Sequence, residues 1–412
     1  MIVIPRPLGP ANYGEWPGGG SMGRIMSSLT CLTTGESHGP CGLAVLTGFP
    51  AGLELDVDFI DEELRRRQGG YGRGARQRIE TDRATFLAGV RSGRTTGAPL
   101  VMQIPNKDSR LDDAERTPPI HRPRPGHADL AGSIKWLTDD CRDTLERASA
   151  RETAARTAAG AAARCLLSEF GIEVFGFVRS VHEVRTDVVV DPSRIAELRA
   201  ARDASEVYAP DEQATEGMME AIRAAKVDKD TVGGLCEVHV IGCPIGLGSC
   251  AVLNDRLDAR IAAAVMGIQA FKSVEIGLGA EVASRRGSEV HDPISYDESL
   301  RDTPLLGFMR DRNNAGGIEG GMTNGMPIVV TGAMKPISTL LKGMPSVDLR
   351  TKQSEHSDYE RSDVCAVSAA SVVMENAVAF EVAAMFLDKF GGDTIREIAA
   401  SYAAYLDAAR TL

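Results

Sequence analysis

Residues 65–78 read RRRQGGYGRGARQR and hold six arginines and four glycines with no acidic residue. The whole chain carries a formal charge of −11, so this concentration of cations predicts that something anionic binds there. Arginine presents a planar fork of donors that suits carboxylate and phosphate oxygens, and glycine lets the backbone approach a ligand closely. On these residues alone two other interpretations stay open: a solvated basic turn, and an RGG-like segment that grips nucleic acid by charge and stacking.

Two histidines stand in stretches whose backbone is restricted. His38 lies in GESHG at residues 35–39, where flanking glycines predict a tight turn that aims the imidazole outward. His127 follows Arg124 in RPRPGHAD at residues 122–129, where two prolines fix the backbone. A histidine can hold or release a proton near neutral pH, so both are candidates for proton transfer. The alternatives are a surface histidine and a proline-rich turn with incidental charges.

Residues 149–152 have the form S-x-x-E, which predicts a capping box at the start of a helix over residues 150–170. That helix is rich in alanine, so a neighbouring backbone can pack closely against it. Arg147 and Arg151 flank its start, and a helix N-terminus with two cations is a candidate phosphate site. The alternative is a capped helix that binds nothing.

Three later stretches could add polar groups to a site. Residues 313–325 are the most glycine-dense part of the chain, which indicates either backbone laid against a ligand or a flexible loop. They match neither the Rossmann nor the P-loop glycine pattern. Residues 335–339 cluster a lysine and two hydroxyls. Ser362 and Asp363 precede a long apolar helix predicted over residues 364–390, and either could serve only as its N-cap.

Composition bounds the class of protein. The 412-residue chain is 43% apolar and 25% charged, which is typical of a globular protein with a sizeable core. Its acidic balance argues against a protein that coats nucleic acid or an anionic membrane. The eight cysteines never form a C-x-x-C pair, so neither a metal site nor a disulfide framework is predicted. Because the sequence shows no signal pattern, we expect a cytoplasmic protein.

Hydrophobic periodicity predicts the elements that must position these stretches. Further helices are expected over residues 59–68, 192–203, 215–226 and 257–268, and strands over residues 100–104, 172–178, 184–190, 235–241 and 328–330. A polar loop is expected over residues 106–122. Neither a repeat nor a linker divides the chain, so residues 29–412 are expected to form one domain, preceded by a poorly ordered extension over residues 1–28.

Seven stretches, taken in order, resemble the chorismate synthase family. They are GESHG at 35–39, RRRQGGYGRGAR at 65–76, RPGHAD at 124–129, SARET at 149–153, EGGMTNG at 319–325, KPIST at 335–339 and RSD at 361–363. The resemblance covers residues 28–390 and is weakest over residues 106–122. It implies an α+β fold, a β-α-β sandwich with antiparallel sheets inside and helices outside, that assembles as a homotetramer.

The resemblance also implies an activity. Members of the family are lyases of the shikimate pathway that convert 5-enolpyruvylshikimate 3-phosphate to chorismate and phosphate by a 1,4-elimination. They use reduced FMN without net oxidation, so NADPH or a separate flavin reductase is expected to supply the reductant. Two rival interpretations are an RNA-binding module centred on residues 65–78 and a different flavin enzyme that performs net redox chemistry.

Residue by residue, the resemblance assigns three groups of side chains. His38 is placed to protonate the departing phosphate, His127 lies near the flavin, and Asp363 assists proton removal through flavin N5. The cations for the substrate's phosphate and carboxylates are Arg67, Arg73, Arg76, Arg124, Arg151 and Arg361. The flavin contacts are Arg147, Ala148, Ser149, Gln269, Ala270, Gly320, Lys335, Pro336, Ile337, Ser338, Thr339 and again Arg361.

Overall fold

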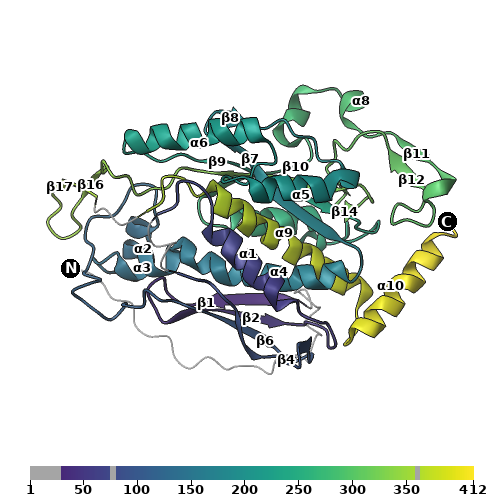
Figure 1. Ribbon diagram of the computed structural model, residues 1–412, viewed down its shortest axis with the longest axis horizontal. Helices are drawn as coiled ribbons and strands as arrows, with labels where there is room; N and C mark the ends of the chain where they lie inside the picture. Colours follow the sequence, from purple (N-terminus) through teal and green to yellow (C-terminus); the bar gives the residue numbers. More distant parts are fainter. Residues whose placement is uncertain (1–28, 75–79, 358–361) are drawn as a thin grey trace, which may run out of the picture.

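Two antiparallel sheets lie on either side of a layer of helices (Figure 1). The computed structural model describes residues 29–74, 80–357 and 362–412, so the predicted extension over residues 1–28 lies outside the described residues. The smaller sheet has the order β1 (Thr30–Thr34), β2 (Cys41–Thr47), β6 (Leu100–Pro105), β3 (Thr85–Ala88). The larger sheet has the order β10 (Phe271–Ile276), β15 (Ile328–Met334), β9 (Gly234–Ile241), β7 (Glu173–Val181), β8 (Val184–Arg185).

Three helices fill the middle layer: α1 (Val57–Gln68), α4 (Thr153–Ser168) and α9 (Val367–Phe390). The alanine-rich α4 packs closely on α9, as its composition predicted: a Cβ on Gly160 would stand 2.2 Å from the Asn376 carbonyl oxygen. By length and composition α9 could cross a membrane, but 83% of its most apolar window is buried inside the protein. Burial of that extent is what a core helix shows.

The two faces of the larger sheet pack against different layers. Alternate residues of a strand point to opposite faces, so Val174 and Val178 of β7 join the main core while Phe175 and Phe177 pack under α5 (Ile195–Ala204). The predicted α+β class with antiparallel sheets is confirmed. "Helices outside" describes α5, whereas α1, α4 and α9 lie between the sheets, and α6 (Glu212–Val227) packs its buried residues into the same main core as they do.

Most elements predicted from periodicity are present within a few residues of their expected bounds. The elements that were not predicted are short, except for a C-terminal helix of 15 residues. The other helices are α2 (Asp129–Trp136), α3 (Arg142–Ala148), α7 (Leu257–Met266), α8 (Gly287–Val290) and α10 (Ile395–Ala409). Four hairpins complete the described chain: β4 (Val90–Arg91) with β5 (Arg94–Thr95), β11 (Ile294–Tyr296) with β12 (Phe308–Arg310), β13 (Ile318–Glu319) with β14 (Met322–Thr323), and β16 (Pro345–Val347) with β17 (Ser354–His356).

Two local predictions were wrong. The capping box does not form, because the chain first makes the 3-10 turn η2 (Ala150–Glu152) and the Glu152 carboxylate pairs with Arg156 at 2.9 Å instead of reaching back to the cap amide. The strand expected over residues 184–190 ends at Arg185. Beyond it, the Arg179 guanidinium binds the carbonyl oxygens of Thr186 and Val188, both at 2.9 Å, and these groups therefore leave the sheet ladder.

The glycine-dense residues 313–325 form a hairpin region that packs backbone on backbone. A Cβ on Gly316 would stand 2.2 Å from the Gly277 amide nitrogen, and Gly316 also has a φ of +63°. Close approach of two protein segments thus accounts for this glycine, without a ligand against it.

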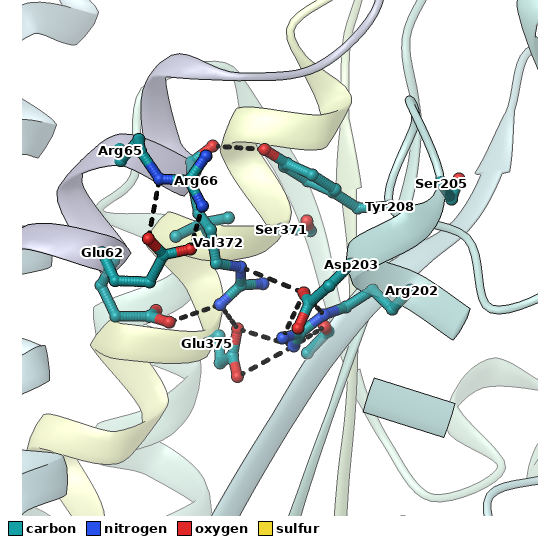
Figure 2. A network of polar contacts seen from close by, with 12 residues as sticks. Glu62, Arg65, Arg66, Arg202, Asp203, Ser205, Tyr208, Ser371, Val372 and Glu375 are labelled. Carbon is teal, nitrogen blue, oxygen red and sulfur yellow. Dashed lines mark hydrogen bonds and ion pairs between the residues drawn. The ribbon is translucent and has the colours of Figure 1, made fainter. Parts of the chain in front are cut away.

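A network of buried charges ties the helical layer together (Figure 2). Glu375 of α9 contacts arginines from three other helices: Arg66 of α1 at 3.1 Å, Arg164 of α4 at 3.2 Å and Arg202 of α5 at 3.4 Å. Glu63 adds a second carboxylate, 2.8 Å from Arg164. Burial alone would raise the pKa of Glu375, but the three arginines hold it below its ordinary value. The network therefore stays ionised inside the core.

We expect Glu375→Gln to destabilise the protein by about 3–5 kcal/mol, because it leaves buried guanidinium groups without their shared carboxylate. Urea denaturation followed by circular dichroism at one protein concentration measures the change. Glu197→Gln is the matched control, since Glu197 pairs with Arg194 at the surface and its loss should leave the midpoint unchanged. Equal midpoints for the Glu375 variant and the native protein would contradict a stabilising network.

Candidate active site

One cavity of about 600 Å³ gathers segments that lie far apart in the sequence. The predicted site residues that line it are His38, Arg67, Arg73, Arg124, His127, Ala148, Ser149, Arg151, Gln269, Ala270, Lys335, Ile337, Ser338, Thr339 and Asp363. Arg76 and Arg361 lie outside the described residues. Arg147, Gly320 and Pro336 are not among the lining residues: Arg147 donates to the Thr33 carbonyl oxygen at 2.9 Å, and Gly320 sits in the β13–β14 hairpin.

The arginines of the predicted anion-binding segment divide between the cavity and the core. Arg66 and Arg67 are only 5% and 3% exposed, which does not fit a solvated turn or a nucleic-acid grip. Arg66 joins the buried network, whereas Arg67 and Arg73 line the cavity. Burial lowers the pKa of Arg67 to about 10. The negative charge of Asp82 acts to raise this pKa, whereas the positive charges of Arg151 and Arg73 lower it further.

Internal carboxylates hold the cavity's arginines in place. Asp82 lies 2.6 Å from Arg151 and 3.7 Å from Arg67. Asp363 pairs with Arg73 at 3.2 Å and accepts from the Gly74 amide at 2.6 Å. The N-cap alternative for Asp363 is wrong, because α9 begins at Val367 after Ala366 and its cap has no side-chain hydrogen bond.

His127 is oriented by its neighbours in RPGHAD. Its Nδ1 contacts Asp129, the first residue of α2, and the same carboxylate receives the Arg124 Nε at 2.8 Å. Arg124 also donates to Thr339 Oγ1 at 3.1 Å, which joins this loop to residues 335–339. Burial opposes ionisation of Asp129, but hydrogen bonds from His127 and Arg124 hold its pKa well below the ordinary value. The proline-rich stretch is therefore an ordered wall of the cavity.

His38 stands in the turn between β1 and β2 and contacts α3. Its Nδ1 lies 2.9 Å from Glu146 Oε1, and its Nε2 lies 3.3 Å from Arg110 Nη2 and 3.8 Å from Asp108 Oδ2. Its ring is 8% exposed and lines the cavity, so the surface-histidine alternative is wrong.

The lining has a cationic part and an apolar part. Among the described lining residues, the cations are Arg67, Arg73, Arg110, Arg124, Arg151 and Lys335, and the carboxylates are Glu80, Asp108 and Asp363. The apolar part comes from Leu145, Ile268, Met334, Ile337, Ala366, Ala370 and Val373. Within the described chain, Gln269 Oε1, Arg67 Nε and Arg73 Nε are buried without a hydrogen-bond partner. An excess of cations and several unpaired polar atoms beside an apolar wall suit an anionic substrate and a flat, polar-edged cofactor.

The sequence prediction missed several residues of this site. Asp82 and Glu146 make their contacts across 69 and 108 residues of chain, and local patterns cannot reveal such pairs. Asp108 and Arg110 fall in the stretch where the family resemblance is weakest. Asp129 could have been found, because it belongs to the quoted RPGHAD motif and is spaced to reach His127.

The fold and this cavity define an α+β protein whose cationic lining suits an anionic ligand. Residues 29–387 match the family model of chorismate synthase. The chain is 49% identical over 381 residues to a chorismate synthase of Desulforamulus reducens, covering 90% of this chain and 97% of that protein. The chain is also 48% identical to a chorismate synthase of Geobacter sulfurreducens, and the match covers 93% of this chain and 99% of that protein. A solved structure of a chorismate synthase matches with a TM-score of 0.76 and 39% identity, over 93% of this chain and 99% of that one.

The chain therefore belongs to the chorismate synthase family. It is an enzyme of that family's lyase class, EC 4.2.3.5. The resemblance drawn from its seven motifs is confirmed.

The lowered pKa of Asp129 predicts a pH-dependent contribution to stability. A carboxyl group whose pKa is depressed on folding stabilises the folded state above its ordinary pKa of about 3.9, and the effect is lost as pH falls through the lower value. Asp129→Asn should lower the free energy of unfolding by about 1–3 kcal/mol at pH 5–7, with the gap to the native protein narrowing below about pH 4. Urea titrations from pH 3 to pH 7 measure the free energy of unfolding of the variant and of the native protein. The Asp311→Asn variant, changed at an exposed carboxylate, serves as control. A gap that stays constant down to pH 3 would count against ionisation as its cause.

Proposed function

We propose that this enzyme converts 5-enolpyruvylshikimate 3-phosphate to chorismate and phosphate by a 1,4-elimination, with reduced FMN in the same cavity. This is the last common step of the shikimate pathway to the aromatic amino acids. The observation that carries the proposal is that His38, Arg73, His127 and Asp363 face one cavity in a chain of this family.

The cationic wall suits the substrate. Its phosphate and two carboxylates need several fixed cations, and Arg67, Arg73 and Arg124 are each held in place by a carboxylate behind them. Arg151 is bound more fully by the protein, since it also donates to Asn106 Oδ1 at 2.7 Å. Its proposed contribution is positive potential at the wall. Arg76 and Arg361 are proposed as further substrate contacts.

The apolar wall and its polar rim suit the flavin. Ala148, Ser149, Gln269, Ala270 and residues 335–339 would hold FMN, and the unpaired Gln269 Oε1 offers an acceptor there. Lys335 donates to the Gly126 carbonyl oxygen at 2.9 Å, which fixes it beside the His127 loop. When bound, reduced flavin supplies electron density to the reacting carbon framework as the C–O bond breaks. Arg147 and Gly320 stay predicted contacts.

The proton chemistry falls to residues at the cationic wall. A 1,4-elimination removes one proton and one phosphate and leaves a new carbon–carbon double bond, so it needs no net oxidant. His38 Nε2 is the proposed proton donor to the departing phosphate, and Asp363 is the proposed carboxylate on the proton-removal side. His127, held by Asp129, would present its ring to the bound cofactor.

We also propose a cytoplasmic homotetramer whose flavin is kept reduced by NADPH or by a separate flavin reductase. Exposed apolar side chains support assembly: Leu32 and Leu87 of the smaller sheet are 67% and 55% exposed, and Ile134 and Trp136 of α2 are 66% and 65% exposed. Light scattering should give four times the chain mass of 43.9 kDa. The mass of a monomer at micromolar concentration would contradict the proposed assembly.

An anaerobic assay with dithionite-reduced FMN tests the reaction. Chorismate and phosphate should appear in equal amounts, with the flavin catalytic. Reductant consumed in step with product would favour the rival flavin enzyme with net redox chemistry. His38→Ala and Asp363→Ala should each lower kcat by about 10²–10⁴-fold, the usual contribution of a positioned acid or base. Folded variants with full turnover would overturn these two roles.

A further inference from the structure

We propose that Glu146 is a positioning residue that fixes His38 with its Nδ1–H toward α3, so that Nε2 is the nitrogen presented to the departing phosphate. The identity of the proton acceptor rests on the proposed function, whereas the fixed orientation of the ring does not. None of the seven motifs contains Glu146, which lies three residues before SARET.

Glu146 holds His38 at more than one point. Its carboxylate oxygens lie 2.9 Å and 3.0 Å from Nδ1, and Oε2 also accepts from the His38 backbone amide at 2.8 Å. The Glu146 carbonyl oxygen accepts from the Ser37 amide at 3.0 Å. With the two side chains 8% and 1% exposed, the imidazole cannot turn over without breaking the contacts of a buried carboxylate.

The chemistry of the partners determines which ring nitrogen carries the fixed proton. Burial would raise the pKa of Glu146, but its hydrogen bonds with His38 outweigh this and keep the pKa below the ordinary value. An ionised carboxylate only accepts, so Nδ1 must carry a hydrogen in both the neutral and the charged ring. The ring nitrogen that is left to exchange a proton with a ligand is therefore Nε2, which faces Arg110 and Asp108.

Charged groups of both signs lie beside Nε2. An arginine only donates, so Arg110 Nη2, at 3.3 Å, suits the neutral ring whose Nε2 accepts. Asp108, at 3.8 Å from Nε2, suits the protonated ring. Among the described residues, charged neighbours of this group also include Arg142, 3.7 Å from Glu146, and Arg116, 3.6 Å from Asp108. A substrate phosphate that attracts Arg110 would favour the protonated ring, whose Nε2–H can be donated to that phosphate.

Glu146→Gln tests this arrangement because it removes the charge while keeping the shape. An amide can either accept from Nδ1–H or donate to an unprotonated Nδ1, so it no longer fixes the ring. We expect kcat to fall about 10–100-fold with KM changed less than about threefold, which is the loss expected when the partner that orients a functional histidine is removed. The alkaline limb of the kcat profile should move to lower pH, because a ring without its anionic partner loses its proton more readily.

Two further variants separate positioning from general effects. Asp143→Asn makes the same acid-to-amide change on the exposed side of α3 and should leave kcat and its pH profile as in the native enzyme. Glu146→Asp keeps the charge on a shorter side chain, so it should restore the native pH profile while kcat stays several-fold reduced. If the glutamine variant does not fold, the aspartate variant decides: native kcat in that variant would overturn the proposal.

A measurement without turnover keeps the outcome separate from the proposed reaction. Deuterium exchange at the carbon between the ring nitrogens, followed by mass spectrometry of the His38 peptide across pH, reports the protonation of this one histidine. The transition should shift to lower pH in Glu146→Gln and stay in place in Asp143→Asn. Superimposable curves for the glutamine variant and the native enzyme would overturn the role of Glu146. Failure of the native enzyme to form chorismate would instead overturn the proposed function and leave this result intact.

Discussion

The structure depends on charges buried where the helices of the middle layer meet. One carboxylate, Glu375, pairs with Arg66 of α1 and Arg202 of α5 (Figure 2) and also with an arginine of α4. These helices therefore cannot slide past α9 without separating ions in a medium where separation is costly. The last turn of α1 is further tied by the Tyr208 hydroxyl, which donates to the Arg66 carbonyl oxygen at 2.9 Å. The next side chain, Arg67, lines the cavity. Fold stability and site geometry thus share one constraint.

Pairing between arginines and carboxylates also determines the structure of the cavity. Its arginines are buried cations, which the protein tolerates only because Asp82, Asp129 and Asp363 stand behind them. These carboxylates occupy some of the donors of each guanidinium and fix its plane. Other donors, such as Arg67 Nε and Arg73 Nε, have no partner within the described chain. The carboxylates therefore offset enough of the positive charge for the arginines to be buried. The remaining positive charge can attract a ligand with several negative charges.

The sequence predicted local elements and motif residues better than it predicted long-range pairs. Strongly periodic stretches such as α9 and β9 were found because hydrophobic spacing follows backbone geometry directly. The predicted capping box does not form, because the Glu152 carboxylate pairs with Arg156 instead of with the cap amide. The position of the helices between the sheets depends on which faces are covered in three dimensions. Motif matching located His38 and Asp363, but not Glu146, whose partner is 108 residues away.

The loop over residues 106–122 shows why weak sequence pattern does not mean a weak structural role. Arg110 and Leu111 both donate their amides to the His38 carbonyl oxygen, at 2.9 Å and 3.1 Å. The Asn106 side chain donates to the Gly39 carbonyl oxygen at 2.8 Å. The turn that carries His38 is thus clamped between α3 on one side and this loop on the other. Because backbone amides make two of these contacts, many side chains can occupy such a loop while the histidine stays in place, and the family pattern can fade there without loss of geometry.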